Sequence, residues 1–306
     1  MNIIDELEWR GAINQQTDAE GLYKLVDEKS ISLYCGIDPT GDSMHIGHLI
    51  PFMILKRFQL AGHHPVILIG GGTGAIGDPS GRTTERVLQT ADQVKHNADS
   101  LTEQMKKLFG EDGSFTMMNN YDWLSKISLL DFLRDYGKLF NINTMLAKDV
   151  VASRLETGIS FTEFSYQILQ SIDYKMLYEK CGVQLQIGGA DQWGNITNGI
   201  ELIRKTNENH EAFGLTIPLM LKADGTKFGK TESGNVWLDA RYTSPYKFYQ
   251  FWLNVSDEDA KRYIKIFTLL DKQTIDDLIA EHDAAPHLRI LQKRLAQEVT
   301  VMIHSQ

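Results

Sequence analysis

Two short motifs rich in histidine, lysine and glycine carry the clearest chemistry in this chain. They are His-Ile-Gly-His at 45–48 and Lys-Phe-Gly-Lys-Thr at 227–231. The first follows the β-rich run 31–36 and opens the apolar segment 49–55, so we expect it at the N-terminus of a helix. Free N–H groups at such an end favour anions. Two imidazoles there, and two ammonium groups elsewhere, are suited to binding the phosphates of ATP.

The segment upstream of the first motif has the composition of a ligand-binding turn. Residues 34–41 read Tyr-Cys-Gly-Ile-Asp-Pro-Thr-Gly, a strand end followed by glycine and proline. Ligand sites in α/β sheets lie beyond the carboxyl ends of strands. Small residues allow a nucleotide to lie against the backbone, and the Thr40 hydroxyl can bond its phosphates. A solvated or core histidine pair is the alternative interpretation of His45 and His48.

The second motif is expected in a mobile loop, because it follows the polar stretch 223–226. A Walker loop is excluded, since Gly229-Lys230-Thr231 would need a glycine at the position that Asp224 occupies. Lysines three residues apart on a loop are suited to closing over a pyrophosphate leaving group as its charge grows. The alternative is a solvated basic turn.

A glycine run at 72–77 satisfies the dinucleotide pattern G-x-G-x-x-G and follows the strand candidate at 65–70. That pattern also requires a helix that begins within the glycines and an acidic residue at the end of the next strand. Pro79 and Gly81 instead keep the chain in a loop. The sequence therefore favours a nucleotide site of another kind over an NAD site.

A third group of polar residues lies on the helix expected from Phe161. Tyr166, Gln170 and Asp173 are spaced by four and three residues, which places them on one helix face. They suit a pocket for a small zwitterion or a phenol, although a solvent-facing stripe has the same pattern. The block 186–195 reads strand, double glycine, acidic residue and helix, and its Asp191 is suited to bonding ribose hydroxyls.

These motifs require a scaffold in which strands and helices alternate. The pattern predicts an α/β, doubly wound parallel sheet with a helical insertion and a C-terminal helical domain. Strands are expected at 32–36, 65–70, 115–119, 184–188 and 215–220, and helices at 44–60, 91–109, 161–180, 189–205, 246–254, 257–269, 273–283 and 286–303. The domains expected are a catalytic domain over 1–220 with an insertion near 121–160, a linker over 221–245 and a helical domain over 246–306.

Composition is that of an ordinary globular enzyme. The chain has 306 residues, 42% hydrophobic and 23% charged, with a net charge of −9. Two cysteines are too few for a disulfide framework or a cysteine-rich zinc site, so a reducing cytoplasm is expected. No apolar run is long enough for a membrane span. The acidic, amphipathic residues 1–9 are unlike a signal peptide and are expected to form a first helix.

Taken together, the chain resembles the bacterial tyrosyl-tRNA synthetases, which are class I aminoacyl-tRNA synthetases. The resemblance rests on blocks in the family's order that cover most of residues 30–235: 34–40, 45–48, 70–82, 166–173, 186–195 and 227–231. It implies that tyrosine reacts with ATP to give tyrosyl-adenylate and pyrophosphate, and that the tyrosyl group then passes to the 3′-terminal adenosine of tRNA(Tyr).

The resemblance also implies a role for each matching position. Tyrosine would be bound by Tyr34, Gly36, Asp38, Asp78, Tyr166, Gln170, Asp173, Gln186 and Gln192. ATP would be bound by Cys35, Gly36, Asp38, Thr40, His45, Gly47, His48, Gly189, Asp191, Gln192, Phe228 and Lys230. The catalytic residues would be Thr40, His45, His48, Arg82, Arg86, Lys227, Lys230 and Thr231. Of these, His48 would meet the ribose and the others the departing pyrophosphate, and Arg82 stands where the family often has lysine. Mg²⁺ would arrive with ATP, and no protein-bound metal is expected.

Three further expectations follow from the resemblance. The insertion at 121–160 would form a homodimer interface, and no membrane partner is expected. The chain looks truncated before the family's small C-terminal S4-like RNA-binding module, because it stops within an expected helix; adenylate formation with weakened tRNA binding is expected. Three alternatives remain. Tyr34 together with Asp173 argues against a tryptophanyl-tRNA synthetase. The 186–195 block argues against another nucleotidyltransferase making pantothenate or dinucleotides, and the intact histidines and lysines argue against a silent scaffold.

Overall fold

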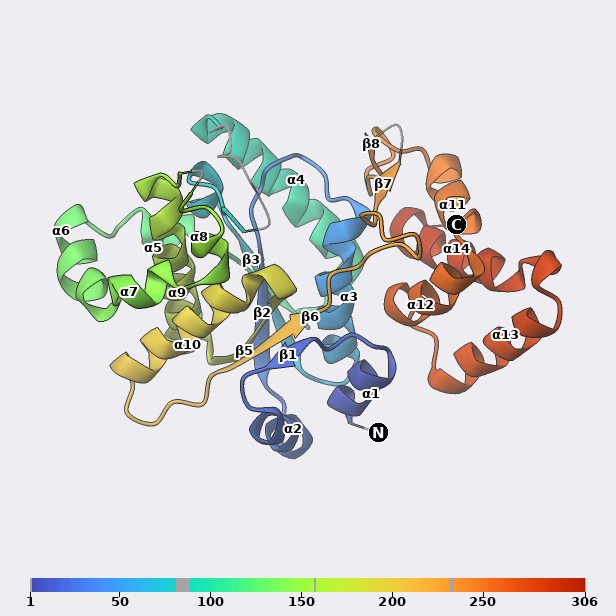
Figure 1. The fold of residues 1–306 in the computed structure, drawn as a ribbon, viewed down its shortest axis with the longest axis horizontal. Helices are drawn as coiled ribbons and strands as arrows, with labels where there is room; N and C mark the ends of the chain where they lie inside the picture. The colour runs from blue at the N-terminus through green and yellow to red at the C-terminus, as the bar shows by residue number, and fades with distance from the viewer. Residues whose placement is uncertain (1, 81–88, 157, 232–233, 306) are drawn as a thin grey trace.

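A six-stranded sheet forms the centre of the computed structural model, which describes residues 2–80, 89–156, 158–231 and 234–305. The strand order is β1-β6-β5-β2-β3-β4 (Figure 1). The strands are β1 (Gln15–Gln16), β2 (Ser32–Ile37), β3 (His64–Ile69), β4 (Thr116–Asn119), β5 (Val183–Gly189) and β6 (Phe213–Ile217). Strands β2 to β6 pair in parallel, and β1 pairs antiparallel with β6 at the edge. The predicted doubly wound α/β fold is confirmed, with one antiparallel edge strand that was not predicted.

Alternating side chains of the strands fill two separate cores, one on each face of the sheet. On β3, Ile67 and Ile69 join the core on one face, whereas Val66 and Leu68 join the other. Helices α1 (Ile3–Trp9), α2 (Ala19–Glu28), α3 (Ile46–Leu60) and α4 (Ala91–Phe109) contribute to the first core; α9 (Phe161–Cys181) and α10 (Trp193–Thr206) contribute to the second. Apolar residues at both parities of a strand are what a sheet covered on both faces requires.

Short helices form the segment between β4 and α9, at one end of the long axis of the molecule (Figure 1). They are α5 (Tyr121–Leu124), α6 (Leu129–Asp131), α7 (Ile142–Leu146) and α8 (Asp149–Ala152), with single turns of other helix types between Phe132 and Leu139. As expected, the described part of 121–160 contains no strand.

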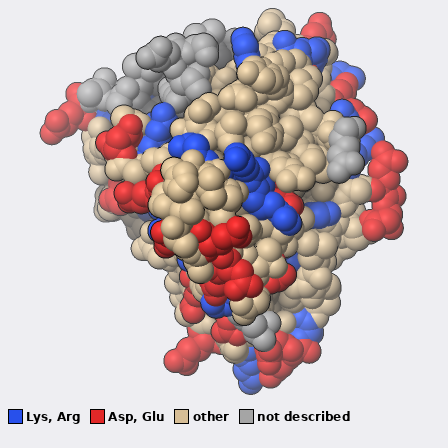
Figure 2. Space-filling view, turned by 90° about the vertical axis from the view of Figure 1, so that its right-hand side faces the viewer, with Lys and Arg blue, Asp and Glu red and all other residues tan. Residues whose placement is uncertain are grey.

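Four helices form the opposite end of the molecule: α11 (Pro245–Leu253), α12 (Asp257–Phe267), α13 (Lys272–Ala284) and α14 (Ile290–His304). Their apolar side chains belong to the same continuous core as α1 and α3. Acidic and basic side chains are both present on this end of the molecule (Figure 2).

Element boundaries differ from the predictions where glycine or proline intervenes. Helix α10 begins at Trp193 rather than at 189, because β5 continues through Gly189 and a 3-10 turn, Ala190–Gln192, follows. Strand β6 ends at Ile217, before Pro218, which cannot donate to a ladder. Helix α2 and strand β1 were not predicted. Among the described residues, no helix is long and apolar enough to cross a membrane.

Candidate active site

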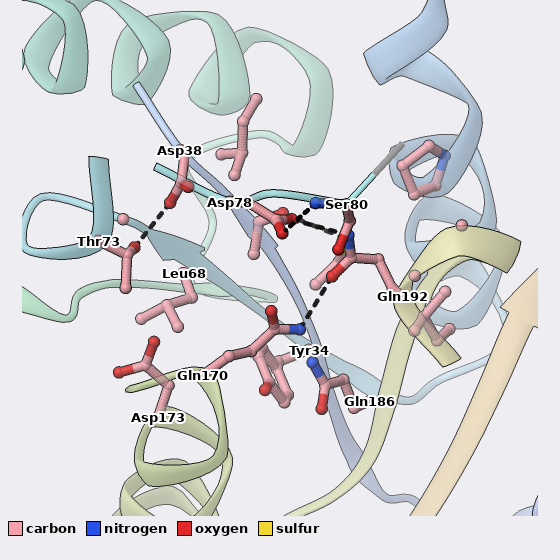
Figure 3. A pocket seen from close by; sticks show the side chains of 18 of the residues that line it. Tyr34, Asp38, Leu68, Thr73, Asp78, Ser80, Gln170, Asp173, Gln186 and Gln192 are labelled. Carbon is pink, nitrogen blue, oxygen red and sulfur yellow. Dashed lines mark hydrogen bonds between the residues drawn. The ribbon is translucent and has the colours of Figure 1, made fainter. Parts of the chain in front are cut away.

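A cavity of about 280 Å³ opens at the carboxyl ends of β2 and β5. These strands are neighbours, yet the chain runs outward from them in opposite directions, to β3 and β4 on one side and to β6 on the other. Such a switch point leaves a crevice in which α/β proteins bind ligands. Residues 34–38 line one wall, and residues 186–189, 191 and 192 line the other. Helix α9 closes the cavity through Tyr166, Gln170 and Asp173, and Figure 3 shows the last two. The three α9 residues thus face a pocket, as predicted, rather than solvent.

Asp173 lines one corner of this cavity and is deeply buried, with an exposed fraction of 2%. The Trp123 indole N–H donates to its Oδ1 at 2.7 Å, and the Asn120 amide donates to its Oδ2 at 2.9 Å. Burial raises the pKa of Asp173 to about 7, although both hydrogen bonds act to lower that pKa. Donors aimed at both oxygens favour the carboxylate as the binding form.

Tyr34 faces the same corner from β2. Its ring packs 5.3 Å from that of Tyr174, and its pKa is raised by burial and by the charge of Asp173. The Tyr34 hydroxyl and the Gln186 Oε1 are buried and make no hydrogen bond to any described atom. Because an unmade buried hydrogen bond costs about 1–3 kcal/mol, a polar ligand that bonds these two atoms would gain affinity from them.

Asp38 and Tyr166 form a second polar corner. Asp38 accepts hydrogen bonds from the Thr73 hydroxyl at 2.6 Å and from the Tyr166 hydroxyl at 2.8 Å. Since the Tyr166 proton is donated to Asp38, the remaining lone pair of its oxygen is able to accept from a ligand. Burial raises the pKa of Tyr166, and the charge of Asp38 adds to the rise.

A chain of amides lies beside this corner and runs from α9 to the beginning of α10. The Gln192 amide donates to Asp78 Oδ2 at 2.8 Å, and Gln170 donates to Gln192 Oε1 at 3.2 Å. Asn195 in turn donates to Gln170 Oε1 at 3.0 Å. The network fixes the direction of each amide.

The cavity carries an excess of negative charge. Among the described residues that line it are Asp38, Asp78, Asp173 and Asp191, with neither lysine nor arginine. Burial raises the pKa of Asp191, as does the charge of Asp78, while Lys227 acts to lower it. The site therefore favours a ligand with a cationic group, and phosphate-binding cations must come from its rim.

His45 and His48 stand at the N-terminus of α3, as predicted. His45 is the N-cap and its Nδ1 accepts from the Gly47 N–H at 3.1 Å, while His48 Nδ1 accepts from the His45 N–H at 3.3 Å. The rings stack with centroids 3.8 Å apart. Because both Nδ1 atoms accept, each neutral ring must carry its proton on Nε2, which is then a donor for an anion. A Cβ at Gly47 would lie 2.9 Å from the His45 ring, so a larger residue there would require that ring to move.

The two motifs of the sequence lie together in space. The Ile46 N–H donates to the Val236 carbonyl at 3.0 Å, and His45 and Trp237 form an isolated β-bridge. Gly229 has φ +82°, and a Cβ there would lie 3.2 Å from Ile46. The lysine motif therefore begins a turn that packs directly on the start of α3 and continues into the hairpin of β7 (Lys230–Thr231) and β8 (Gly234–Asn235).

Phe228 points away from the cavity. Its ring is 6% exposed and lies 4.9 Å from the ring of Tyr263 and 5.1 Å from that of Phe267. Any contact of Phe228 with ATP would therefore involve its backbone, while its neighbour Lys227 is exposed.

The predicted site residues fall into three groups. Those that line the cavity are Tyr34, Cys35, Gly36, Asp38, Thr40, His48, Asp78, Tyr166, Gln170, Asp173, Gln186, Gly189, Asp191 and Gln192. Those outside its lining are His45, Gly47, Lys227 and Phe228, and for Lys230 and Thr231 only the backbone is described. Arg82 and Arg86 lie outside the described residues.

Sequence reasoning missed the residues that support the site. Thr73, Ser80 and Asn120 line the cavity, and Trp123 and Asn195 hold groups that do. Asn120 had a signal, because it directly follows β4 at the edge where the other strands place site residues. The glycine run at 72–77 forms a 3-10 turn, Thr73–Ala75, and no α-helix, which removes the dinucleotide interpretation.

A helix N-terminus with two histidines, joined to a lysine turn above a nucleotide crevice, defines an adenylate-forming α/β enzyme. The chain belongs to the family described as tRNA synthetases class I (W and Y), which residues 26–306 match.

Within that family its relatives are tyrosine–tRNA ligases. The chain is 71% identical over 306 residues to tyrosine–tRNA ligase 1 of Enterococcus faecalis, covering 99% of this chain and 73% of the relative. It is 70% identical to the tyrosine–tRNA ligase of Levilactobacillus brevis, covering 100% and 73%. Among solved structures, a C-terminally truncated mitochondrial tyrosyl-tRNA synthetase of Aspergillus nidulans superposes with a TM-score of 0.89 at 34% identity, covering 99% of this chain and 90% of that one.

Proposed function

We propose that this protein is a tyrosine–tRNA ligase that activates L-tyrosine with ATP and transfers the tyrosyl group to the 3′-terminal adenosine of tRNA(Tyr). The assignment of tyrosine as the amino acid substrate rests on the Tyr34 hydroxyl, which is buried beside Asp173 and has no hydrogen-bond partner among the described residues. A phenol can donate to the Asp173 carboxylate and accept from Tyr34. An indole presents one N–H donor and no acceptor, so a tryptophan substrate would leave Tyr34 unpartnered.

The ammonium group of tyrosine is assigned to the opposite side of the cavity. Tyr166, Gln170 and Asp78 each direct an oxygen there, and each is held by a hydrogen bond to a neighbour. Three acceptors match the three donors of an ammonium group. Asp38 and Gln192 would then lie near the tyrosine carboxylate and the reacting phosphate.

ATP is assigned to the rim between β5 and the start of α3. Asp191 would bond ribose hydroxyls, with Cys35, Gly36, His48 and Gly189 close to the sugar. His45 and Thr40 would bind the phosphates, together with Lys227, Lys230, Thr231, Arg82 and Arg86. Mg²⁺ would come with ATP as part of the substrate.

In the first step, a tyrosine carboxylate oxygen attacks the α-phosphorus, the bond from that phosphorus to the bridging oxygen breaks, and pyrophosphate leaves with the electron pair. In the second, a ribose hydroxyl of tRNA attacks the carbonyl carbon, the bond from that carbon to the phosphate oxygen breaks, and AMP leaves with the electron pair while the phosphate takes up the hydroxyl proton. The carboxylate is itself the nucleophile, so the protein acts by orientation and by stabilising charge on the leaving group. We place this reaction in the cytoplasm.

We also propose that the protein works as a homodimer through the 121–160 insertion. Large apolar side chains are exposed on this segment: Leu129 is 72%, Leu130 75% and Leu133 53% exposed. Several such side chains close together mark a surface that binds another protein. The domain division into 1–220, 221–245 and 246–306 is part of the same proposal.

Pyrophosphate exchange into ATP, measured with each of the twenty amino acids in the absence of tRNA, tests the proposed function. Exchange with tyrosine alone is the expected result. Exchange with tryptophan would assign the other amino acid of the family, and absence of exchange with every amino acid would overturn the proposal in favour of a silent scaffold.

A further inference from the structure

Two buried arginines join the C-terminal helices to the sheet domain. Arg57 comes from the last turn of α3, and its Nη2 donates to the carbonyls of Lys265 at 3.0 Å, Ile266 at 2.9 Å and Thr268 at 2.5 Å. Arg10, which caps the C-terminus of α1, donates to the same Lys265 carbonyl at 2.6 Å and to that of Leu270 at 2.7 Å. Arg57 is 3% and Arg10 5% exposed. We call Arg10 and Arg57 the arginine clamp.

Burial of the two guanidinium groups of the clamp carries a large desolvation cost. These two groups share one carboxylate, Glu6, whose Oε1 lies 2.8 Å from Arg10 Nε and 3.7 Å from Arg57 Nε. The rest of their charge is offset by carbonyls at the C-terminal end of α12, where the helix dipole is negative. Apolar packing would join the elements at lower cost, whereas directed hydrogen bonds fix the orientation of α12.

Helix α12 also holds residues 222–229, the loop that carries Lys227, which we call the lysine loop. Asp259, in its first turn, accepts a hydrogen bond from the Ala223 N–H at 2.9 Å. Tyr263 and Phe267 form a socket for the Phe228 ring, together with Trp252 of α11 at 6.0 Å. Lys227 therefore stands between two points that α12 secures.

Helix α3 connects the clamp to the other motif. Its N-cap is His45 and its last turn carries Arg57, so one continuous helix has the histidines at one end and the clamp at the other. Helices α3 and α12 thus form a frame whose geometry sets the position of Lys227 relative to His45.

We propose that Arg57 and Arg10 are positioning residues for adenylate formation, which act by fixing α12 and thereby the lysine loop over the phosphates. This inference rests on the proposed function. The clamp touches neither the tyrosine corner nor the histidines, so its loss should change the rate of activation more than the binding of tyrosine. A misplacement of about 1 Å at a reacting group is enough to cost about 100-fold in rate.

The test compares Arg57→Met with the wild-type protein in two readouts. Single-turnover tyrosine activation at saturating ATP should slow by about tenfold or more, while the tyrosine Kd, measured without ATP, stays within about threefold. Hydrogen exchange, which needs no activity, should become about tenfold faster in peptides over 222–229 and stay unchanged over 183–189. If Arg57→Met does not fold, Arg10→Gln, which keeps Arg57, takes its place.

Matched variants separate positioning from general destabilisation. Leu22→Ala removes a fully buried side chain of α2 and should leave the activation rate and loop exchange as in the wild type. Phe228→Leu disrupts the socket and keeps the clamp. Because both variants release the same loop, the losses of activation rate in Phe228→Leu and Arg57→Met should not add in the double variant. Normal activation in Arg57→Met, equal effects in Leu22→Ala, or additive losses in the double variant would each overturn the proposal. If the wild-type protein shows no tyrosine-dependent pyrophosphate exchange, the proposed function is refuted. Hydrogen exchange over 222–229 would then still test whether the clamp fixes the loop.

Discussion

Asp173 combines full burial with two directed donors, so its protonation should control the binding of tyrosine. Its pKa of about 7 is raised by burial, which means that the free protein holds the neutral carboxyl below pH 7. A phenol hydroxyl donates best to the ionised form, so protons compete with tyrosine. Tyrosine affinity should therefore rise as pH increases towards 7, by at most tenfold per pH unit, and then level off.

Calorimetric titration of tyrosine between pH 5.5 and 8.5 checks this dependence. Asp173→Asn cannot ionise and should bind tyrosine weakly with little change over that range. A wild-type affinity that is independent of pH would contradict the assignment of Asp173 to the phenol.

In our proposal, His45 stabilises the transition state of tyrosine activation. Its Nε2–H is directed by the bond that Nδ1 accepts from Gly47. His45→Ala should slow tyrosine activation by a factor equivalent to roughly 2–4 kcal/mol, because it removes a donor to developing charge. Tyrosine affinity should stay nearly constant, as measured by equilibrium binding without ATP. Equal losses of rate and affinity would place His45 outside the reaction.

At the scale of elements, α9 is held by a buried ion pair. Arg154, just after α8, meets Glu163 with Nη2–Oε2 at 2.9 Å and Nη1–Oε1 at 3.2 Å, and both side chains are buried. Removing one partner leaves a buried charge uncompensated. Arg154→Met should lower the free energy of unfolding by roughly 3–5 kcal/mol.

Urea unfolding at fixed protein concentration measures this loss. The double variant Arg154→Met/Glu163→Gln should regain a large part of it, because the uncompensated charge is gone. If the double variant is no more stable than the single one, burial of the charge is not the cause.

Elements were predictable where local patterns are strong. Runs of apolar residues located β2 to β5 and α3, and the glycine and proline punctuation placed the ligand side of the sheet. Strand β1, with two residues, has no pattern of its own, because it exists only through pairing with β6. The support of Asp173 by Trp123 escaped prediction for a similar reason: the two residues meet only when α5 and α9 pack.

At the scale of the whole molecule, the insertion and the C-terminal helices occupy opposite ends (Figure 1). The proposed dimer would use the first and leave the second free. Leu130→Asp should shift the protein towards monomers in sedimentation velocity, because a charge would be buried in an apolar interface. Leu288→Asp, at a position 51% exposed on the opposite end, is the control and should keep the wild-type distribution. A monomeric wild-type protein would contradict the dimer.

The sequence by itself determined the chemistry of this protein: the motif residues, their order, and the glycines and prolines that place them beside strand ends. Local sequence is sufficient for these features, because turns, helix starts and strand runs depend on neighbouring residues. Only the tertiary structure decided what surrounds the motifs. The contact of Ile46 with Val236, the hydrogen bonds that Asp173 receives and the arginine clamp on α12 join residues far apart in the chain. Burial and directed hydrogen bonds arise from packing, which no single stretch of sequence contains.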